Sequence, residues 1–519
     1  MVRSPAGIHR EQMLSRRGSG ATLRRRRVGP PPIRPGLSRW LRARLRCVVP
    51  PLLLLAALVG AYPAPTLADP WYRSSPLLGV VDAGRQLQAA HKANAGWDRI
   101  VFLWQEIQPY DPTDWYLDRY LDRFGLRKQL ESGLPLVAVV QGTPGWAAGD
   151  PRDGAAGVPT GLNYAVENRE NNFGRFMLRL ASTFKGRIHA WIIWNEPDFR
   201  PGDSGSWWTW AGNPEDLFKV VRTGYRAVKQ ADPKALVIFP ATTYFVDAVN
   251  DRDLFFSRVL AEAAKDPEAA GHGFYFDAVA VNLYCSADMI YRAYGLYAEV
   301  LARHKLTKPI WLTETNCPTY NDGASPVVPV YHISTSEQAG YLIQAIAMAR
   351  AAGYQRIGWY AMVDHEQRLG TADRWGLLRP DGSPRPAFHA FRVATRYLGG
   401  PDQSARFAPV GEGGQGGWPV YRVVLDDGTR RRVQVLWRGP DGPTSIRLEA
   451  QGRAAYTVDV LGRMSTLERK DGWWQVALPP PRVRQSFDPP GYPEVGDPIL
   501  LVETDPPRGR SLAPPRATF

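Results

Sequence analysis

Short apolar runs alternate with helix-like segments from residue 77 to about residue 400, and this alternation allows few folds. The runs recur at intervals of roughly 30 to 50 residues, which is the spacing of repeated strand-and-helix units. Such units predict parallel strands with helices packed outside them. Eight strands are expected, at residues 77–81, 100–104, 136–140, 190–194, 236–240, 278–284, 310–313 and 356–361.

Four of the intervening segments carry apolar residues at helical spacing, at residues 173–184, 214–231, 255–265 and 336–352. Eight strands, each followed by a helix, predict an α/β fold in which residues 69–400 form a closed (β/α)8 TIM barrel. A doubly wound open sheet is the alternative. It is disfavoured because no glycine-rich phosphate-binding motif follows the first strand.

The chain changes character near Gly399-Gly400, where Gly and Pro begin to separate runs rich in Val, Tyr and Trp. Residues 420–425 and 433–437 flank an Asp-Asp-Gly turn, which predicts a β-hairpin, and Asp471-Gly472 before residues 473–478 gives a second turn signal. We therefore expect an antiparallel β-sandwich at residues 401–504 and a flexible Pro/Arg-rich tail at residues 505–519.

The net charge of +14 comes mostly from the first residues of the chain. Residues 1–46 hold thirteen Arg and one Glu, residues 47–68 hold no charge, and the rest carries only +2. A body with so little net charge does not suggest a nucleic-acid partner. The basic run leads into an apolar stretch at 48–61, so residues 1–68 read as a secretory signal or an N-terminal anchor. We expect a secreted or cell-envelope protein, with any membrane association limited to this segment.

Of the three cysteines, Cys47 lies in the leader, and Cys285 and Cys317 follow neighbouring predicted strands. The last two could form a disulfide or remain buried thiols, and the sequence leaves both open. The eight His are scattered, and no metal-ligand spacing of His or Cys occurs, so no metal is expected.

Two glutamates stand where the chemistry of a barrel is found, at the carboxyl ends of strands. Glu196 follows an apolar run in Trp194-Asn195-Glu196-Pro197, and Glu314 does so in Thr313-Glu314-Thr315-Asn316. Most glutamates are solvated surface residues, but a glutamate after a buried strand and beside Asn fits that description poorly. The interval between the two glutamates equals three strand-and-helix units, which places them on the fourth and seventh strands.

These two motifs resemble the paired signatures of retaining glycoside hydrolases of clan A, with family 39-like and family 5-like members nearest. The likeness runs from about residue 77 to residue 398. It also includes Arg99 in the second strand, the segment Thr143-Pro144-Gly145-Trp146 and the closing segment 381–386.

The resemblance implies that Glu196 is the acid/base, that Glu314 is the nucleophile and that no cofactor is needed. It also implies that Arg99 and Tyr284 donate to Glu314 and that Asn195 holds the sugar 2-hydroxyl. Acetal cleavage needs both acids, because one protonates the leaving oxygen and the other faces a cationic transition state. Asn282 stands where cellulase-like members often have His, and we also count it among the substrate-binding residues.

Tryptophans are expected to form the sugar platforms, because the apolar face of a pyranose stacks on an indole ring. Trp359, on the eighth strand, matches the platform beneath the reacting sugar by resemblance. Trp146 and Trp104 are expected at neighbouring subsites, with core packing as the alternative. The loop after the fourth strand is expected to wall the cleft with Trp207, Trp208 and Trp210.

The sequence thus predicts a retaining O-glycosyl hydrolase that acts on a β-linked glycoside or polysaccharide. A transglycosidase with the same site is one alternative, and a non-catalytic sugar-binding or envelope-polysaccharide protein is another. An esterase is disfavoured because the chain has no Gly-x-Ser-x-Gly motif.

Overall fold

The structure, a computed structural model, describes residues 77–202, 208–319, 322, 333–364, 374–414, 417–427, 431–481, 495–505 and 517–518. All of these residues belong to one compact unit, Ala64–Phe519. The expected leader at 1–68, Trp207 and most of the expected tail lie outside the described residues.

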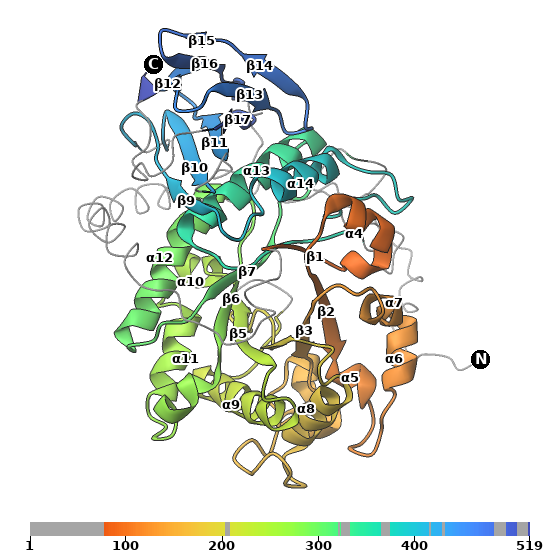
Figure 1. Ribbon diagram of the computed structural model, residues 1–519. Coiled ribbons are helices and arrows are strands. Elements are labelled where there is room, and N and C mark those ends of the chain that lie inside the picture. The colour runs from red at the N-terminus through yellow and green to blue at the C-terminus, as the bar shows by residue number, and fades with distance from the viewer. Residues whose placement is uncertain are drawn as a thin grey trace, which may run out of the picture. The chain divides into compact units, whose positions relative to one another are not determined.

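Eight parallel strands close into a barrel in chain order, as the alternation predicts (Figure 1). Strand β1 pairs with β2 on one side and with β8 on the other, which closes the ring. The barrel strands are β1 Leu78–Val81, β2 Asp98–Leu103, β3 Leu136–Gln141, β4 Ala190–Ile193, β5 Leu236–Thr242, β6 Ala278–Asn282, β7 Ile310–Thr315 and β8 Ile357–Trp359.

Helices surround the barrel, and two long ones begin at capping boxes that can be read in the sequence. Asn213 and Asp216 exchange hydrogen bonds at the start of α9, and Ser334 and Glu337 do so at the start of α13. The α-helices are α4 Leu87–Ala93, α5 Trp104–Ile107, α6 Leu117–Arg123, α7 Leu126–Leu130, α8 Asn172–Thr183, α9 Pro214–Ala231, α10 Phe245–Val249, α11 Phe255–Ala263, α12 Ala287–Arg303, α13 Thr335–Ala352 and α14 Pro386–Tyr397. The 3-10 helices are η1 Ala83–Gln86, η2 Gly145–Ala147, η3 Pro151–Ala156 and η4 Ala270–Tyr275.

The amino end of the barrel is filled by the indole of Trp97, just before β2. Its Nε1 donates to the carbonyl of Leu77 at 3.1 Å. Two glycines make room for the ring, because a Cβ on Gly79 would lie 2.1 Å from Trp97 Cδ2 and one on Gly358 would lie 2.8 Å from Trp97 Cη2. With this end packed, an open site can only lie at the carboxyl ends of the strands.

A β-sandwich follows the barrel, as predicted. Its six-stranded sheet has the order β14-β13-β17-β11-β10-β9 and its four-stranded sheet the order β15-β16-β12-β18. The strands are β9 Ser404–Phe407, β10 Val420–Asp426, β11 Arg431–Arg438, β12 Ser445–Glu449, β13 Ala454–Val458, β14 Met464–Leu467, β15 Arg469–Lys470, β16 Trp473–Ala477, β17 Ile499–Thr504 and β18 Ala517–Thr518.

Both predicted turn regions join antiparallel strands. The first joins β10 to β11, and the second joins β15 to β16 through Asp471 and Gly472, which have φ of 50° and 86°. Positive φ at both central residues is the requirement of a type I′ hairpin turn. Residues 517–518, within the expected tail, pair as β18 with β12.

The six-stranded sheet is covered on both faces. Val423 and Val435 on one face belong to the same core as the barrel helices. Leu436 and Leu501 on the other face pack with Trp474 of the four-stranded sheet. Helix α13 is also hydrogen-bonded to the chain just before β17, because Gln344 Nε2 donates to the carbonyl of Gly496 at 3.0 Å. Barrel and sandwich therefore share one hydrophobic core, and Figure 1 shows β9 and β10 next to α13.

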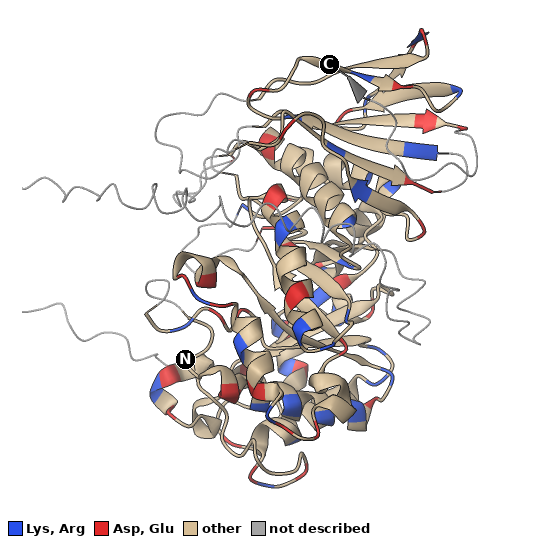
Figure 2. Ribbon diagram, turned by 90° about the vertical axis from the view of Figure 1, so that its left-hand side faces the viewer, with Lys and Arg blue, Asp and Glu red and all other residues tan. Residues whose placement is uncertain are grey.

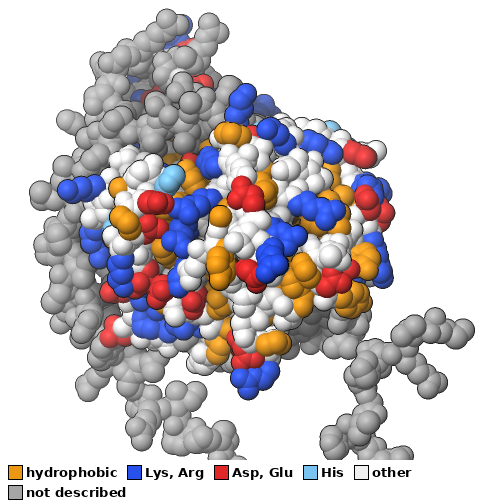
Figure 3. Space-filling view, turned by 90° about the horizontal axis from the view of Figure 1, so that it is seen from below, with side chains coloured by type: hydrophobic (Ala, Val, Ile, Leu, Met, Phe, Trp, Pro, Cys, Tyr) orange, Lys and Arg blue, Asp and Glu red, His pale blue; other side chains and the backbone are white. Residues whose placement is uncertain are grey.

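Charged side chains of both signs are interspersed over the described part of the chain (Figure 2). The face seen in Figure 3 shows the same mixture, with single hydrophobic side chains between the charges. Such a mixture gives this face little net field. In the described part of the chain, no helix combines the length and the hydropathy needed to cross a bilayer.

Candidate active site

The two predicted glutamates lie at the carboxyl end of the barrel. Glu196 is the third residue after the end of β4, and Glu314 is the fifth residue of β7. The other members of this site come from β2 and β6: Arg99 is the second residue of β2, Asn282 ends β6 and Tyr284 follows it.

The backbone after β4 turns sharply to present Glu196. Trp194 and Glu196 have φ of 83° and 50°, in the left-handed region that side chains other than glycine rarely adopt. The turn is held by the N–H of Glu196, which donates to the carbonyl of Ala241 at 2.7 Å, and by Trp194 Nε1, which donates to the carbonyl of Thr209 at 2.9 Å. Such conformations cost roughly 1 to 3 kcal/mol each and cluster at functional sites.

Glu314 is held by two donors. Arg99 Nη1 lies 2.5 Å from Glu314 Oε1, and the Tyr284 hydroxyl donates to Glu314 Oε2. These are the two donors expected from the sequence. The guanidinium on one oxygen and the hydroxyl on the other fix the orientation of the carboxylate.

Two asparagines connect Glu196 to this cluster. Asn282 Nδ2 donates to Glu196 Oε1 at 2.8 Å, and Asn282 Oδ1 accepts from Thr313 Oγ1 at 2.8 Å. Asn195 Oδ1 accepts from Arg99 Nη2 at 2.8 Å and from Asn282 Nδ2 at 3.3 Å. Asn195 Nδ2 makes no hydrogen bond within the described part of the chain, so it is free to donate to a ligand.

The pKa of Glu196 is raised to about 8, first by burial and then by the negative charge of Glu314, while the hydrogen bond from Asn282 opposes the rise. Glu196 is therefore largely protonated at neutral pH. The site thus combines a protonated carboxyl group with a carboxylate that is ion-paired to Arg99, which is the arrangement required for general acid catalysis beside a nucleophile.

The aromatic side chains beside Glu314 are Tyr360 and Trp375, both half-buried. Their ring centroids lie 6.4 Å and 5.2 Å from that of Tyr284. Sequence reasoning missed both: Trp375 belongs to no motif, and Tyr360 was passed over for its neighbour Trp359.

One buried amide holds the backbone of these two aromatic residues. Asn316 Nδ2 donates to the carbonyl of Tyr360 and to that of Trp375, the latter at 2.5 Å. Asn316 Oδ1 accepts from Gln338 Nε2 at 3.1 Å. The end of β7 therefore fixes the segments that carry both rings.

The platform predicted at Trp359 is wrong. Trp359 is 1% exposed and packs against Tyr341 of α13, with ring centroids 6.2 Å apart. The interior position of β8 is occupied by Gly358, so its neighbour Trp359 points outward to the helices.

Trp104 is also a core residue and not part of a subsite. It is 0% exposed, and its ring lies 5.5 Å from that of Phe173 and 5.3 Å from that of Phe176, both on α8. Trp104 begins α5, and there its side chain turns away from the barrel mouth toward α8.

The remaining tryptophans divide between core and surface. Trp210 is buried against Trp194, whereas Trp208 is 38% exposed in the loop after β4. Trp146 is half-buried and lines a groove beside α8 whose lining residues include none of the glutamate cluster. Trp208 is thus the exposed member of the predicted loop tryptophans that the structure describes.

Cys285 and Cys317 form a disulfide, which decides between the two alternatives left by the sequence. The bond joins the chain just past β6 to the chain just past β7. It therefore lies one residue from Tyr284 and three residues from Glu314, and it limits how far the ends of these strands can separate.

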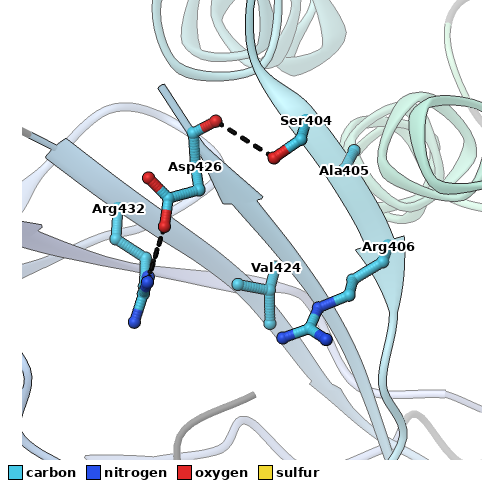
Figure 4. A pocket seen from close by; sticks show the side chains of 6 residues that line it. All are labelled: Ser404, Ala405, Arg406, Val424, Asp426 and Arg432. Atoms are coloured by element: carbon cyan, nitrogen blue, oxygen red, sulfur yellow. Dashed lines mark hydrogen bonds and ion pairs between the residues drawn. The ribbon is translucent and has the colours of Figure 1, made fainter. Parts of the chain in front are cut away.

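The described residues outside this site offer little else for chemistry. A small pocket between β9, β10 and β11 has a volume of about 20 Å³, about one water molecule, and contains the ion pair of Asp426 and Arg432 at 2.6 Å (Figure 4). Among the described residues, no three His, Cys, Asp or Glu side chains are grouped so that they could hold a metal ion.

No protein-family model and no curated protein matches the sequence. Solved structures do match the fold. A family 39 glycoside hydrolase from Bacteroides cellulosilyticus WH2 is 16% identical, with 83% of this chain and 82% of that chain covered and a TM-score of 0.57.

Two further matches are glycoside hydrolases of family 30. The catalytic domain of xylanase C from Talaromyces cellulolyticus is 12% identical, with coverage of 83% and 98% and a TM-score of 0.51. An endoxylanase from Clostridium papyrosolvens C71 is 11% identical, with coverage of 83% and 98% and a TM-score of 0.50. At these identities the likeness establishes the fold of the chain.

Proposed function

We propose that this chain is a retaining glycoside hydrolase that cleaves O-glycosidic bonds of a β-linked glycoside or polysaccharide. The observation that carries the proposal is the pairing at the barrel mouth of Glu196, whose pKa is raised to about 8, with Glu314, which is ion-paired to Arg99. An acid that donates and a carboxylate that attacks are the two groups that a double displacement at an acetal requires.

In the first step, a carboxylate oxygen of Glu314 forms a bond to the anomeric carbon while the bond from that carbon to the leaving oxygen breaks. The proton of Glu196 passes to the leaving oxygen, so the departing group is a neutral alcohol. In the second step, water attacks the anomeric carbon, its proton passes to Glu196, and the carboxylate of Glu314 is released.

The surroundings explain how Glu196 can serve as acid and then as base. Burial keeps its proton before the first step, and the charge of Glu314 adds to this effect. When Glu314 becomes an ester, that charge disappears, and the pKa of Glu196 falls. The same carboxyl group is then able to accept the proton of the attacking water.

The sugar contacts follow from groups that face the cluster. Asn195 has a free Nδ2 to donate to a hydroxyl group beside the reacting carbon. Tyr360 and Trp375 offer aromatic faces next to Tyr284 for the apolar side of a pyranose ring. Asn195 was expected in this role from the sequence, whereas Tyr360 and Trp375 take the place of the buried Trp359 as the aromatic platform.

The test is an assay of the wild type and of Glu314→Gln and Glu196→Gln on aryl β-glycosides, xylan and other β-glycans, with the first product followed by anomeric NMR. We expect hydrolysis with retention and a loss of at least about 10⁴-fold in kcat for Glu314→Gln. Glu196→Gln should lose less on substrates with acidic phenol leaving groups, because these need no proton.

The matched control is Glu106→Gln, since Glu106 is an exposed acid paired with Arg123. It should leave kcat at the wild-type value. An inverted first product would contradict the assignment of Glu314 as nucleophile, and equal rates for wild type and Glu314→Gln would contradict the enzymatic function itself.

We also propose that the protein is exported to the cell envelope or the medium. The basic and apolar leader at 1–68 supports this, and a disulfide between Cys285 and Cys317 suits an oxidising compartment. Fractionation of cells that express the full chain tests the proposal, and recovery of all the protein from the reducing cytosol would contradict it.

A further inference from the structure

A second hollow lies between the loop after α5 and the first turns of α8. Its volume is about 350 Å³, within the range of small-molecule sites. The lining residues include Gln108, Trp146, Glu167, Asn172 and Arg175.

The aromatic wall of this groove is rigid. Trp146 Nε1 donates to the carbonyl of Gln108 at 2.8 Å, and the Trp146 ring meets Trp104 edge-on with centroids 5.9 Å apart. Trp104 is itself fixed, because its Nε1 donates to Gln108 Oε1 at 2.7 Å. A half-buried indole held in this way offers a preformed flat surface, and little conformational entropy is lost when a ligand stacks on it.

Polar groups with unused hydrogen-bonding capacity surround that ring. Asn172 makes no side-chain hydrogen bond within the described residues. Arg175 is exposed, and its guanidinium has one long contact there, to the carbonyl of Arg169 at 3.5 Å. The Glu167 carboxylate accepts from Gln230 Nε2 on its Oε1. An amide, a guanidinium and a carboxylate are planar groups, each able to engage two neighbouring hydroxyl groups.

We infer that this groove is an auxiliary glycan-binding site that holds a sugar residue of the same β-glycan by stacking on Trp146. The inference rests on the proposed function only for the identity of the glycan. A flat ring with planar polar groups around it suits a pyranose, which has an apolar face and a rim of hydroxyls. A helical or extended peptide would require a row of apolar recesses instead.

The place of the groove supports a polymeric ligand. Trp146 lies in η2, just after β3, and therefore at the same end of the barrel as Glu196, which follows the neighbouring strand β4. A chain of several sugars bound at the groove would be kept close to the glutamates. The site would then raise the local concentration of polymer at the catalytic end.

The test uses the full chain with Glu314→Gln, so that bound glycan is not consumed. Six-residue fragments of xylan, cellulose and β-1,3-glucan are titrated by calorimetry, and retention on the parent polysaccharides is measured. We expect two sites for a fragment that binds. Adding Trp146→Ala should remove one site and lower retention about tenfold, whereas Trp146→Phe, which keeps a flat ring, should preserve both.

The matched control is Trp473→Ala, which removes a half-buried tryptophan from the C-terminal sheet and should leave both sites intact. Circular dichroism checks that each variant is folded. A single site in the parent, or unchanged binding in a folded Trp146→Ala variant, would overturn the inference, as would binding of none of the fragments. The wild type could hydrolyse none of the substrates while Trp146→Ala still removes a glycan-binding site. In that case the proposed function is wrong and the inference about the groove is supported.

Discussion

Arg99 and Glu314 form an ion pair with a 2.5 Å separation in a place where their side chains are only 2% and 7% exposed. Burying both charges costs several kcal/mol for each ion, and their attraction offsets this cost only with good geometry and further hydrogen bonds. Tyr284 and Asn195 supply those bonds. A costly pair at the mouth of a barrel is better explained by the chemistry of Glu314 than by stability.

Replacing Arg99 should damage both activity and stability. Arg99→Met leaves the Glu314 carboxylate buried without a counter-charge, so we expect the free energy of unfolding to fall by about 3 kcal/mol. The variant should also lose at least about 100-fold in kcat, because the guanidinium no longer holds the Glu314 carboxylate in its attacking position. Urea unfolding and aryl-glycoside kinetics measure the two effects.

The control for this experiment is Arg123→Met, which breaks an exposed ion pair with Glu106. It should cost less than about 1 kcal/mol and leave kcat unchanged. If Arg99→Met and Arg123→Met have equal effects on stability and kcat, the ion pair of Arg99 with Glu314 has no particular role in catalysis.

Activity should decline on the alkaline side with an apparent pKa of about 8, the value to which burial and Glu314 raise Glu196. The direction follows from the role: the first step needs protonated Glu196, so kcat/KM falls as pH rises through that value. In Glu196→Gln, the residual activity on substrates with acidic leaving groups should not decline with rising pH in this range. If the alkaline decline in kcat/KM persists in the variant, a group other than Glu196 causes it.

Three aromatic residues in or after β8 should differ in the effect of their replacement by Ala. Trp359→Ala removes a buried indole and should lower the free energy of unfolding by about 3 to 5 kcal/mol. Tyr360→Ala and Trp375→Ala remove half-buried rings beside Tyr284, and they should mainly raise KM, with smaller stability losses. Calorimetry measures the stability of each variant, and kinetics on one substrate measure its KM. A Trp359→Ala variant with wild-type stability but a raised KM would show that Trp359 is the platform after all.

Loss of the disulfide should act on stability and on catalysis together. Cys285 and Cys317 are 32 residues apart, and a loop of that length predicts about 3 to 4 kcal/mol of stabilisation. The double variant Cys285→Ala/Cys317→Ala should also lose kcat, since Tyr284 precedes the bond and donates to Glu314. The matched comparison is the wild type with its disulfide reduced, whose free energy of unfolding should equal that of the double variant. A variant with wild-type kcat would show that the bond does not position Tyr284.

The barrel and the two glutamates could be predicted because both depend on local patterns. The eight apolar runs mark the strands, and Glu196 and Glu314 each follow such a run within a recognisable motif. The contacts of Arg99 and Tyr284 with Glu314 also agree with the resemblance, since it fixes positions on the strands.

Side-chain directions at strand ends could not be predicted in the same way. The register between β7 and β8 shifts between the pairs Leu312 with Ile357 and Thr315 with Trp359, so simple alternation no longer gives the inward face. This is why Trp359 was misplaced and Tyr360 was missed. Trp375 reaches the site through the buried Asn316 amide, a long-range contact that no local pattern encodes.

Helix α13 makes the C-terminal sheet an obligatory partner of the barrel. Every residue of α13 from Gln338 to Arg350 is buried, and Arg350 Nη2 donates to the carbonyls of Gly400 and Gln403 at 2.9 Å and 2.7 Å. A protein truncated at residue 400 would expose the side of this helix that the C-terminal sheet covers, while its other side would still pack on Trp359. Grafting the catalytic half onto another scaffold, or trimming it for expression, therefore has to keep the following hundred or so residues, because without them an apolar surface of the barrel would meet water.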